Sequence, residues 1–250
     1  MSRCKKFGLV AFVEILLVSV LCLVAQASPS RTNEVRESRY EVFSHGMKVG
    51  QVKTICGPVV QDRKTAFRFA SSTSIDVHFL FFSYRLEKKE EAMIGKEGTY
   101  NYRRTMQEND KAVLVAGKVE TGAFRFVIDE GGSKRTLVIP RDTYDFTTMD
   151  CPEITMGPGE KERVLRILDL ENLVIVTRKY NWVRDEDVDI KGRKIHCKVI
   201  DFEDLNKKGR RWVEGDDLGV LVLRQDGSGK GVTYSSRLAS QVIRSGMGVW

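Results

Sequence analysis

Along most of the chain, apolar and polar residues alternate with a period of two, in short runs separated by glycine turns. Such alternation is typical of β-strands, because successive side chains of a strand point to opposite faces of its sheet. The run 123–129 is a clear case, in which Phe124, Phe126 and Ile128 share one face. Repeated many times, the pattern predicts an antiparallel all-β domain.

Glycine-containing dipeptides mark the turns between these runs. They are His45-Gly46, Thr121-Gly122, Gly131-Gly132, Lys191-Gly192, Gly215-Asp216 and Asp226-Gly227. The strands predicted between them span 39–44, 49–55, 65–75, 112–120, 123–129, 133–139, 163–169, 173–184, 193–202, 210–214, 220–224 and 231–238. The segment 84–93 is rich in helix-forming residues, so a helix is its alternative, but the surrounding pattern favours a long exposed strand.

A sheet of about eleven or more strands does not stay flat, so it must curl or split into a sandwich. We expect one large curved antiparallel sheet that forms a half-barrel or barrel-like domain, with little helix outside the N-terminal segment. The interruption at 140–159 predicts a loop between two β lobes. It is not a typical linker between domains, because its residues Tyr144 and Phe146 need burial. We therefore expect a single β-rich domain over 28–250, with a core at about 39–239.

The N-terminus has the pattern of a secretory signal. Basic residues near the start precede an apolar run over 7–24, which ends in the small residues Ala25 and Ala27. We expect residues 1–27 to be a signal peptide that is cleaved between Ala27 and Ser28, which predicts a periplasmic or secreted protein. The alternative is an uncleaved anchor, since 7–27 is just long enough to span a bilayer, although an acidic residue within it counts against this.

Composition and charge narrow the class of protein. Hydrophobic residues make up 42% of the chain and charged residues 30%, which is typical of a globular domain. A basic cluster at 207–211 predicts either contact with anionic lipid headgroups or a solvated turn. Because no aromatic residues interleave with a basic stripe, we do not expect a nucleic-acid partner.

The sequence carries no recognisable catalytic or metal motif. His196 and Cys197 are adjacent strand residues, so their side chains point to opposite faces and cannot form a thiolate–imidazolium pair. The acidic run from Asp185 to Asp189 resembles the start of a calcium loop, but Ile190 stands where that loop needs glycine. We therefore expect no enzyme activity, no metal and no cofactor.

Three cysteines follow the predicted signal: Cys56, Cys151 and Cys197. In an oxidising compartment one pair can form a disulfide and leave one thiol free. We expect the pair to be Cys151 and Cys197, with the other two pairings as alternatives.

Aromatic and aliphatic residues suggest a ligand site. Val174, Val176, Tyr180 and Trp182 share one strand face, and Trp212 follows a basic pair. In a half-barrel these side chains could line an apolar cavity for a lipid-like or amphiphilic ligand. The alternative is that they are ordinary core.

Several runs of residues together resemble a bacterial family of exported β-rich proteins known only as a domain of unknown function. The resemblance covers about 39–239 and rests on 84–91, 144–148, 164–169, 211–212, 217–222 and 234–238. It implies a fold and no catalytic residues. By looser analogy such proteins are similar to the half-barrel lipoprotein carriers of the periplasm, whose concave apolar face holds acyl chains.

These observations lead to three hypotheses of function. The first is a non-enzymatic periplasmic or cell-envelope protein that binds a lipid or another amphiphile. The second is a structural or assembly module that contacts a partner protein of the envelope through an exposed sheet edge. The third is a hydrolase with an unrecognised site.

Overall fold

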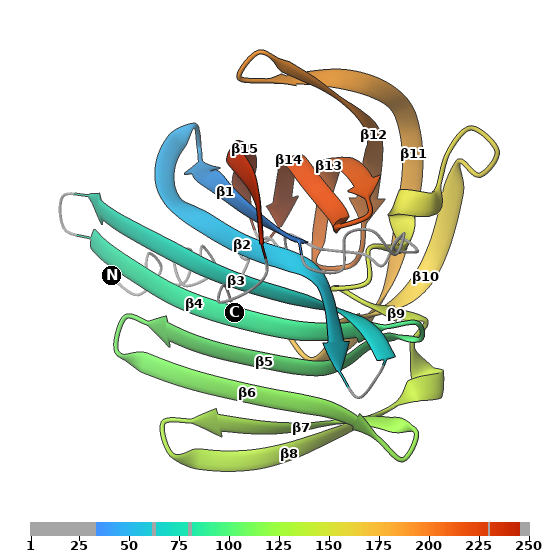
Figure 1. Ribbon diagram of the computed structural model, residues 1–250. Coiled ribbons are helices and arrows are strands. Elements are labelled where there is room, and N and C mark those ends of the chain that lie inside the picture. Colours follow the sequence, from blue (N-terminus) through green and yellow to red (C-terminus); the bar gives the residue numbers. More distant parts are fainter. Residues whose placement is uncertain (1–33, 62–63, 80–81, 230, 246–250) are drawn as a thin grey trace.

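The computed structural model describes residues 34–61, 64–79, 82–229 and 231–245, and these residues form one curved sheet of 15 strands (Figure 1). Within these ranges there is no α-helix, only two short 3-10 turns, η2 (Arg141–Thr143) and η3 (Pro152–Thr155). No described helix is long and apolar enough to cross a membrane. The predicted all-β, barrel-like sheet is confirmed. The predicted signal segment, with its cleavage site between Ala27 and Ser28, lies outside the described residues.

The strands form two meanders that meet at the pair of β1 and β15. The first meander contains β1 (Glu34–Ser44), β2 (Met47–Gln61), β3 (Lys64–Phe79), β4 (Phe82–Gly95), β5 (Gly98–Glu108), β6 (Lys111–Glu120), β7 (Ala123–Glu130) and β8 (Ser133–Pro140). The second contains β9 (Phe146–Thr147), β10 (Glu162–Asp169), β11 (Val174–Ile190), β12 (Arg193–Glu203), β13 (Lys207–Asp216), β14 (Gly219–Gly229) and β15 (Val232–Ser245). The two ends of the sheet are therefore β8 and β9.

Most of the predicted turns are confirmed. At Gly131-Gly132, φ values of +62° and +91° describe a two-residue turn of type I′ between β7 and β8. The dipeptides at 45–46, 121–122 and 191–192 likewise have positive φ at both residues. The segment 84–93 lies within β4, so its interpretation as a strand is confirmed.

Two turn predictions are wrong, because their glycines lie inside strands. The turn expected at 215–216 falls at 217–218, and Gly227 lies within β14. Gly227 pairs with Tyr234, and a Cβ atom at this position would lie 2.4 Å from the ring atom Cζ of that tyrosine. Gly209 is covered in the same way by the ring of Phe202. At these positions glycine is required because an aromatic ring of the neighbouring strand packs over it, and not because the backbone turns there.

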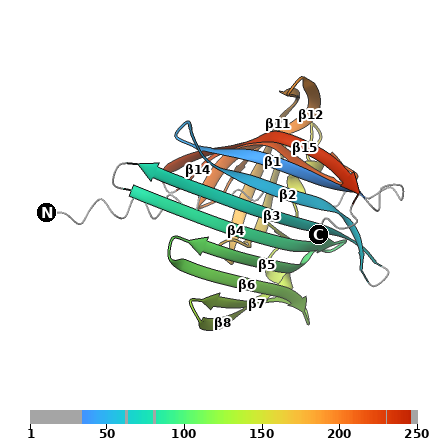
Figure 2. The same cartoon turned by 60° about the vertical axis from the view of Figure 1, so that its left-hand side comes forward.

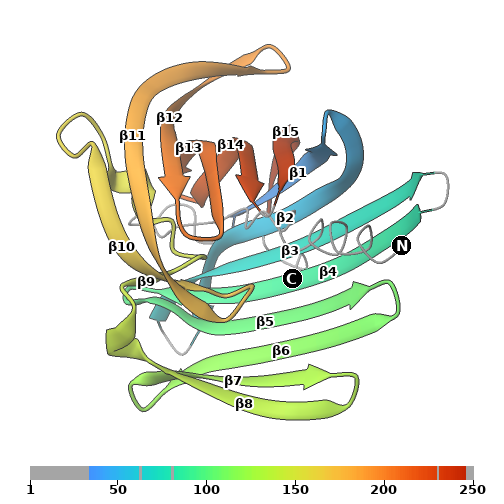
Figure 3. The ribbon, with the colours of Figure 1, turned by 180° about the vertical axis from the view of Figure 1, so that it is seen from behind.

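The sheet curls until its β9 end reaches β5, and side chains rather than a backbone ladder close it. The buried carboxylate of Asp150 accepts hydrogen bonds from Thr99 N (2.9 Å), Thr99 Oγ1 (2.7 Å) and Thr147 N (2.6 Å). Strands β6 to β8 continue beyond this closure, and we call them the flap (Figures 2 and 3). The backbone ladder therefore joins the flap to the rest of the sheet only through the pair of β6 and β5.

The three cysteines within the described residues, Cys56, Cys151 and Cys197, are buried, and the expected disulfide between Cys151 and Cys197 is not formed in the structure. The two residues lie on opposite faces of the sheet. Cys197 shares a face with Trp212 and donates from Sγ to a backbone oxygen of β11 at 3.3 Å. Cys151 lies beside Arg211, whose side chain points to the other face.

Candidate ligand-binding cleft

The strand face predicted to line a cavity is largely core. Val176 and Tyr180 are buried, Trp182 is half-buried, and Val174 is exposed. Arg178 lies in the middle of this face and is also buried. The four expected side chains do share a face, but a charged residue interrupts it.

The fifth expected residue, Trp212, lies on the opposite face of the sheet. Trp182 pairs with Ile200, whereas Trp212 pairs with the neighbouring residue of the same strand, Val199. The guanidinium of Arg224 covers the ring of Trp212 at 4.7 Å from the ring centre. The five residues therefore do not surround one cavity.

The inner face of the curled sheet, which we define as the face that carries Arg104 and Arg178, holds a network of buried ion pairs. They are Lys88–Glu90 (2.5 Å), Lys207–Asp169 (3.1 Å), Arg178–Asp204 (2.8 Å) and Arg211–Glu153 (2.7 Å). Buried charges persist in proteins where they are paired and hydrogen-bonded. The sequence signal for this network is a charged residue at an inward position of an apolar strand, as with Arg178 between Val176 and Tyr180.

Two buried carboxyl groups of the inner face, Asp169 of the network and the nearby Glu171, have opposite pKa shifts. Burial acts to raise the pKa of Asp169, but the charges of Lys207 and Arg178 outweigh it and lower this pKa to about 2. Burial raises the pKa of Glu171 to about 8, although the nearby charges of Lys88 and Lys207 act to lower it. At neutral pH Asp169 is therefore ionised, while most Glu171 side chains keep their proton.

A cleft of about 220 Å³ opens between the inner face of β5 to β8 and the turn 170–173, which connects β10 to β11. Its apolar lining consists of Met106, Val113, Val115, Ile128 and Leu173. Its polar lining consists of Arg104, Glu108, Glu130, Arg135, Glu171 and Asn172. We call it the Arg104 cleft, because this residue is its most buried charge.

Arg104 is held in place by the backbone of the turn. Its side chain is 6% exposed, and Nη1 donates to the backbone oxygens of Leu170 (3.5 Å) and Glu171 (2.6 Å). Nε of Arg104 and Oε1 of Glu171 are both shielded from solvent and have no hydrogen-bond partner among the described residues. Unpartnered buried polar atoms are rare in folded proteins and need an explanation. Here both atoms belong to side chains that line the same cleft.

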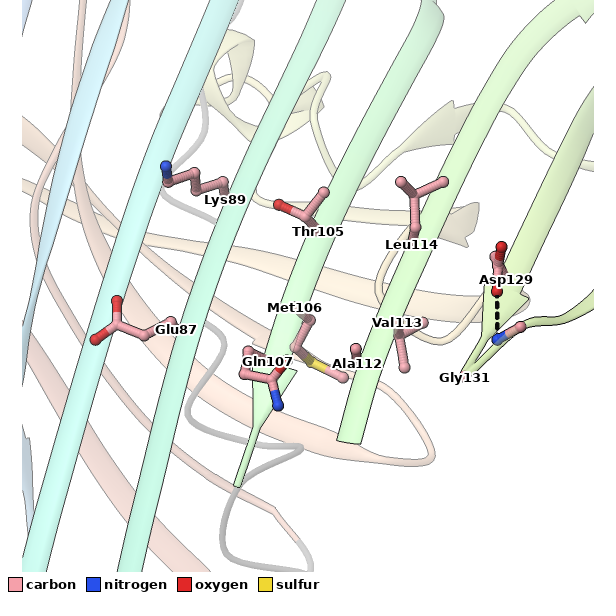
Figure 4. A pocket seen from close by; sticks show the side chains of 11 residues that line it. Glu87, Lys89, Thr105, Met106, Gln107, Ala112, Val113, Leu114, Asp129 and Gly131 are labelled. Carbon is pink, nitrogen blue, oxygen red and sulfur yellow. Dashed lines mark hydrogen bonds between the residues drawn. The ribbon is translucent and has the colours of Figure 1, made fainter. Parts of the chain in front are cut away.

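Two other hollows lie on the outer face of the sheet. One of about 490 Å³ crosses β4 to β7, where Lys89, Thr105 and Leu114 project from neighbouring strands (Figure 4). The other, of about 810 Å³, crosses β11 to β15, and its charged side chains pair with one another, as in Arg210–Asp201 and Arg224–Asp226. Neither contains a buried polar side chain without a partner, within the ranges that the structure describes. The Arg104 cleft is therefore the stronger candidate.

No group of three or more potential metal-ligating side chains comes together in the described part of the chain. In the hairpin of β11 and β12, the imidazole of His196 lies 2.9 Å from the carboxylate of Asp187, and both side chains are exposed. The acidic run from Asp185 to Asp189 lies near the end of β11, in the hairpin that the predicted turn at 191–192 closes, and Asp189 accepts from Gly192 N at 2.8 Å.

No protein-family model and no curated protein matches the chain. Among solved structures, the fold matches the crystal structure of a β-barrel-like protein of domain of unknown function DUF1849 from Brucella abortus. The match has a TM-score of 0.61 and 12% sequence identity, and it covers 86% of this chain and 99% of that chain. At this identity the likeness is one of fold alone. The resemblance to a β-rich domain of unknown function, expected from the sequence, is thereby confirmed for the fold.

Proposed function

We propose that this chain is a non-enzymatic protein of the cell envelope that binds an amphiphile with a carboxylate head in the Arg104 cleft. The observation that carries the proposal is the buried guanidinium of Arg104, whose Nε atom has no partner among the described residues and which lines a mainly apolar cleft. The proposed location, periplasmic or secreted, rests on the signal-like segment 1–27.

The side chains of the cleft match the two parts of such a ligand. Arg104 supplies a buried positive charge, and a protonated Glu171 supplies a hydroxyl donor, so both can donate to one carboxylate. The apolar residues Met106, Val115 and Leu173 can cover the first methylene groups of its chain. At about 220 Å³ the cleft is smaller than the roughly 300–1,000 Å³ of typical ligand pockets. The rest of the chain would therefore extend along the inner face of the flap.

The first test uses a fatty acid that carries an environment-sensitive fluorophore at its apolar end. The mature protein is expected to bind it at micromolar concentrations, equivalent to about −8 kcal/mol. Arg104→Met removes the charge but keeps much of the side-chain volume, and should weaken binding at least about tenfold. The matched control is Arg103→Met, because Arg103 is adjacent but exposed on the outer face. Equal affinities of the two variants would refute the proposal.

The pH dependence gives the same test a second readout. Binding should weaken as pH rises through about 8, because ionised Glu171 would repel the carboxylate instead of donating to it. Glu171→Gln keeps a neutral donor at this position and should remove this pH dependence. A fatty alcohol with the same fluorophore should bind more weakly than the acid and be insensitive to Arg104→Met.

A further inference from the structure

The strand β8 forms an open end of the sheet. It pairs with β7 over its whole length without a bulge, and no described strand pairs with its other side. Open edges of this kind are templates for pairing with another chain, and proteins usually protect them with bulges, inward-pointing charges or covering segments. The edge of β8 therefore raises the question of what pairs with it.

The two-residue turn before β8 determines which backbone N–H and C=O groups of β8 point toward β7 and which point away from it. In a two-residue hairpin the flanking pair, Glu130 and Ser133, exchanges both hydrogen bonds, and every second pair after it does the same. The bond from Arg141 N to Gly122 O, at 2.9 Å, fits the same alternation at the other end of the hairpin, since Arg141 is an even number of residues from Ser133. The N–H and C=O groups of Lys134, Thr136 and Val138 therefore point away from β7. At the next such position Pro140 has no N–H, which ends the open edge.

The two cations of β8 are already neutralised by acidic residues of β7. Lys134 Nζ lies 3.9 Å from the carboxylate of Asp129, and Arg135 lies 3.4 Å from that of Glu130. Both pairs are largely exposed, so each contributes little to stability. They do, however, reduce the repulsion that free cations on an edge would exert on an approaching strand.

We propose that β8 pairs in antiparallel orientation with β8 of a second copy of this chain, about a two-fold axis at Thr136. This register places the outward groups of Lys134 opposite those of Val138, and Thr136 opposite itself, for about six N–H···O bonds. It sets no like charges directly opposite each other. It also places the stem of Lys134 beside Val138, which is 45% exposed in the single chain.

Cysteine trapping tests both the pairing and its register. In the proposed dimer the two Thr136 residues are an H-bonded pair with Cα atoms about 5.5 Å apart, within disulfide range. Thr136→Cys should therefore form a disulfide-linked dimer on mild oxidation. Val138→Cys is the matched control, because its two copies would be about 13 Å apart along the strands. Failure of Thr136→Cys to cross-link, or equal cross-linking of both variants, would overturn the proposal.

A proline variant tests the pairing without cross-linking. Thr136→Pro removes an N–H that points away from β7, so the hairpin of β7 and β8 should keep its hydrogen bonds. Sedimentation equilibrium should show a concentration-dependent dimer for the unmodified chain and at least a tenfold larger dissociation constant for the variant. The melting temperature of the variant checks that it folds. An unmodified chain that stays monomeric at the highest soluble concentration would contradict the proposal.

Discussion

The carboxylate of Asp150 makes the most direct test of how the sheet closes. It accepts three buried hydrogen bonds, two from Thr99 and one from Thr147, and so joins β5 to β9 across the closure. Asp150→Ala removes all three bonds at once. The hydroxyl of Thr99 keeps the hydroxyl of Thr147 as a partner at 2.9 Å, so the backbone N–H groups of Thr99 and Thr147 are the ones left without an acceptor.

The expected loss of stability follows from those two groups. A buried N–H without an acceptor costs about 1–3 kcal/mol, which gives about 2–6 kcal/mol for the pair. Burial also raises the pKa of Asp150, so removing this carboxylate relieves part of its own desolvation. We therefore expect a net loss of about 2–4 kcal/mol in the free energy of unfolding. For a chain of this size that corresponds to a melting temperature lower by about 4–16 °C.

Urea unfolding followed by tryptophan fluorescence measures this loss, and hydrogen exchange at Thr99 and Thr147 shows whether the closure opens locally. Asp150→Asn should lose less, because its amide oxygen keeps the bonds from Thr99 while its NH₂ group faces Thr147 N. The control Asp142→Ala alters an exposed carboxylate in the same connecting segment and should change stability by less than about 0.5 kcal/mol. If Asp150→Ala is as stable as this control, apolar packing and not the carboxylate closes the sheet.

Two further predictions concern the inner face. The folded chain keeps a proton on Glu171 that the unfolded chain releases, so the stability of the protein should fall as pH rises from about 4.5 to about 8, and Glu171→Gln should flatten this slope in a series of urea titrations. An identical slope in the variant would assign the pH dependence to other groups. Gly227→Ala should destabilise by about 1–3 kcal/mol, since the new methyl group would overlap the ring of Tyr234, whereas Gly159→Ala, where there is open space, should be neutral. Equal melting temperatures for these two variants would show that the ring moves aside without cost.

The class of fold was predictable because it depends on local chemistry. The alternation of Phe124, Phe126 and Ile128 holds in the structure, where all three are buried on one face of β7. The two-residue turn at Gly131-Gly132 was also predictable, because glycine readily adopts the positive φ values that both of its positions require. Each of these features is decided by residues that are close together in the sequence.

The candidate cleft could not be predicted in the same way. Arg104 and Glu171 are 67 positions apart, and they meet only because the sheet curls until the turn after β10 reaches β5. Period-two alternation places Arg104 on the face of Tyr102 and Met106, and Arg103 on the other face, in agreement with the burial of the first and the exposure of the second. The alternation does not show which groups Arg104 meets on that face. The closure of the sheet brings the backbone oxygens of Leu170 and Glu171 to Arg104, and these groups hold its side chain in the cleft.

The sequence by itself determined most of the strands and turns and the all-β class, since the periods and turn preferences that specify them act over a few residues. Strands β5 and β9 were not among the predicted ranges. Only the tertiary structure decided that Trp212 lies apart from Trp182, that Gly227 faces a tyrosine ring, and which thiols lie on opposite faces. These outcomes depend on strand register and curvature. Register is set by pairs of residues distant in the chain, and a shift of one residue moves every side chain of a strand to the other face.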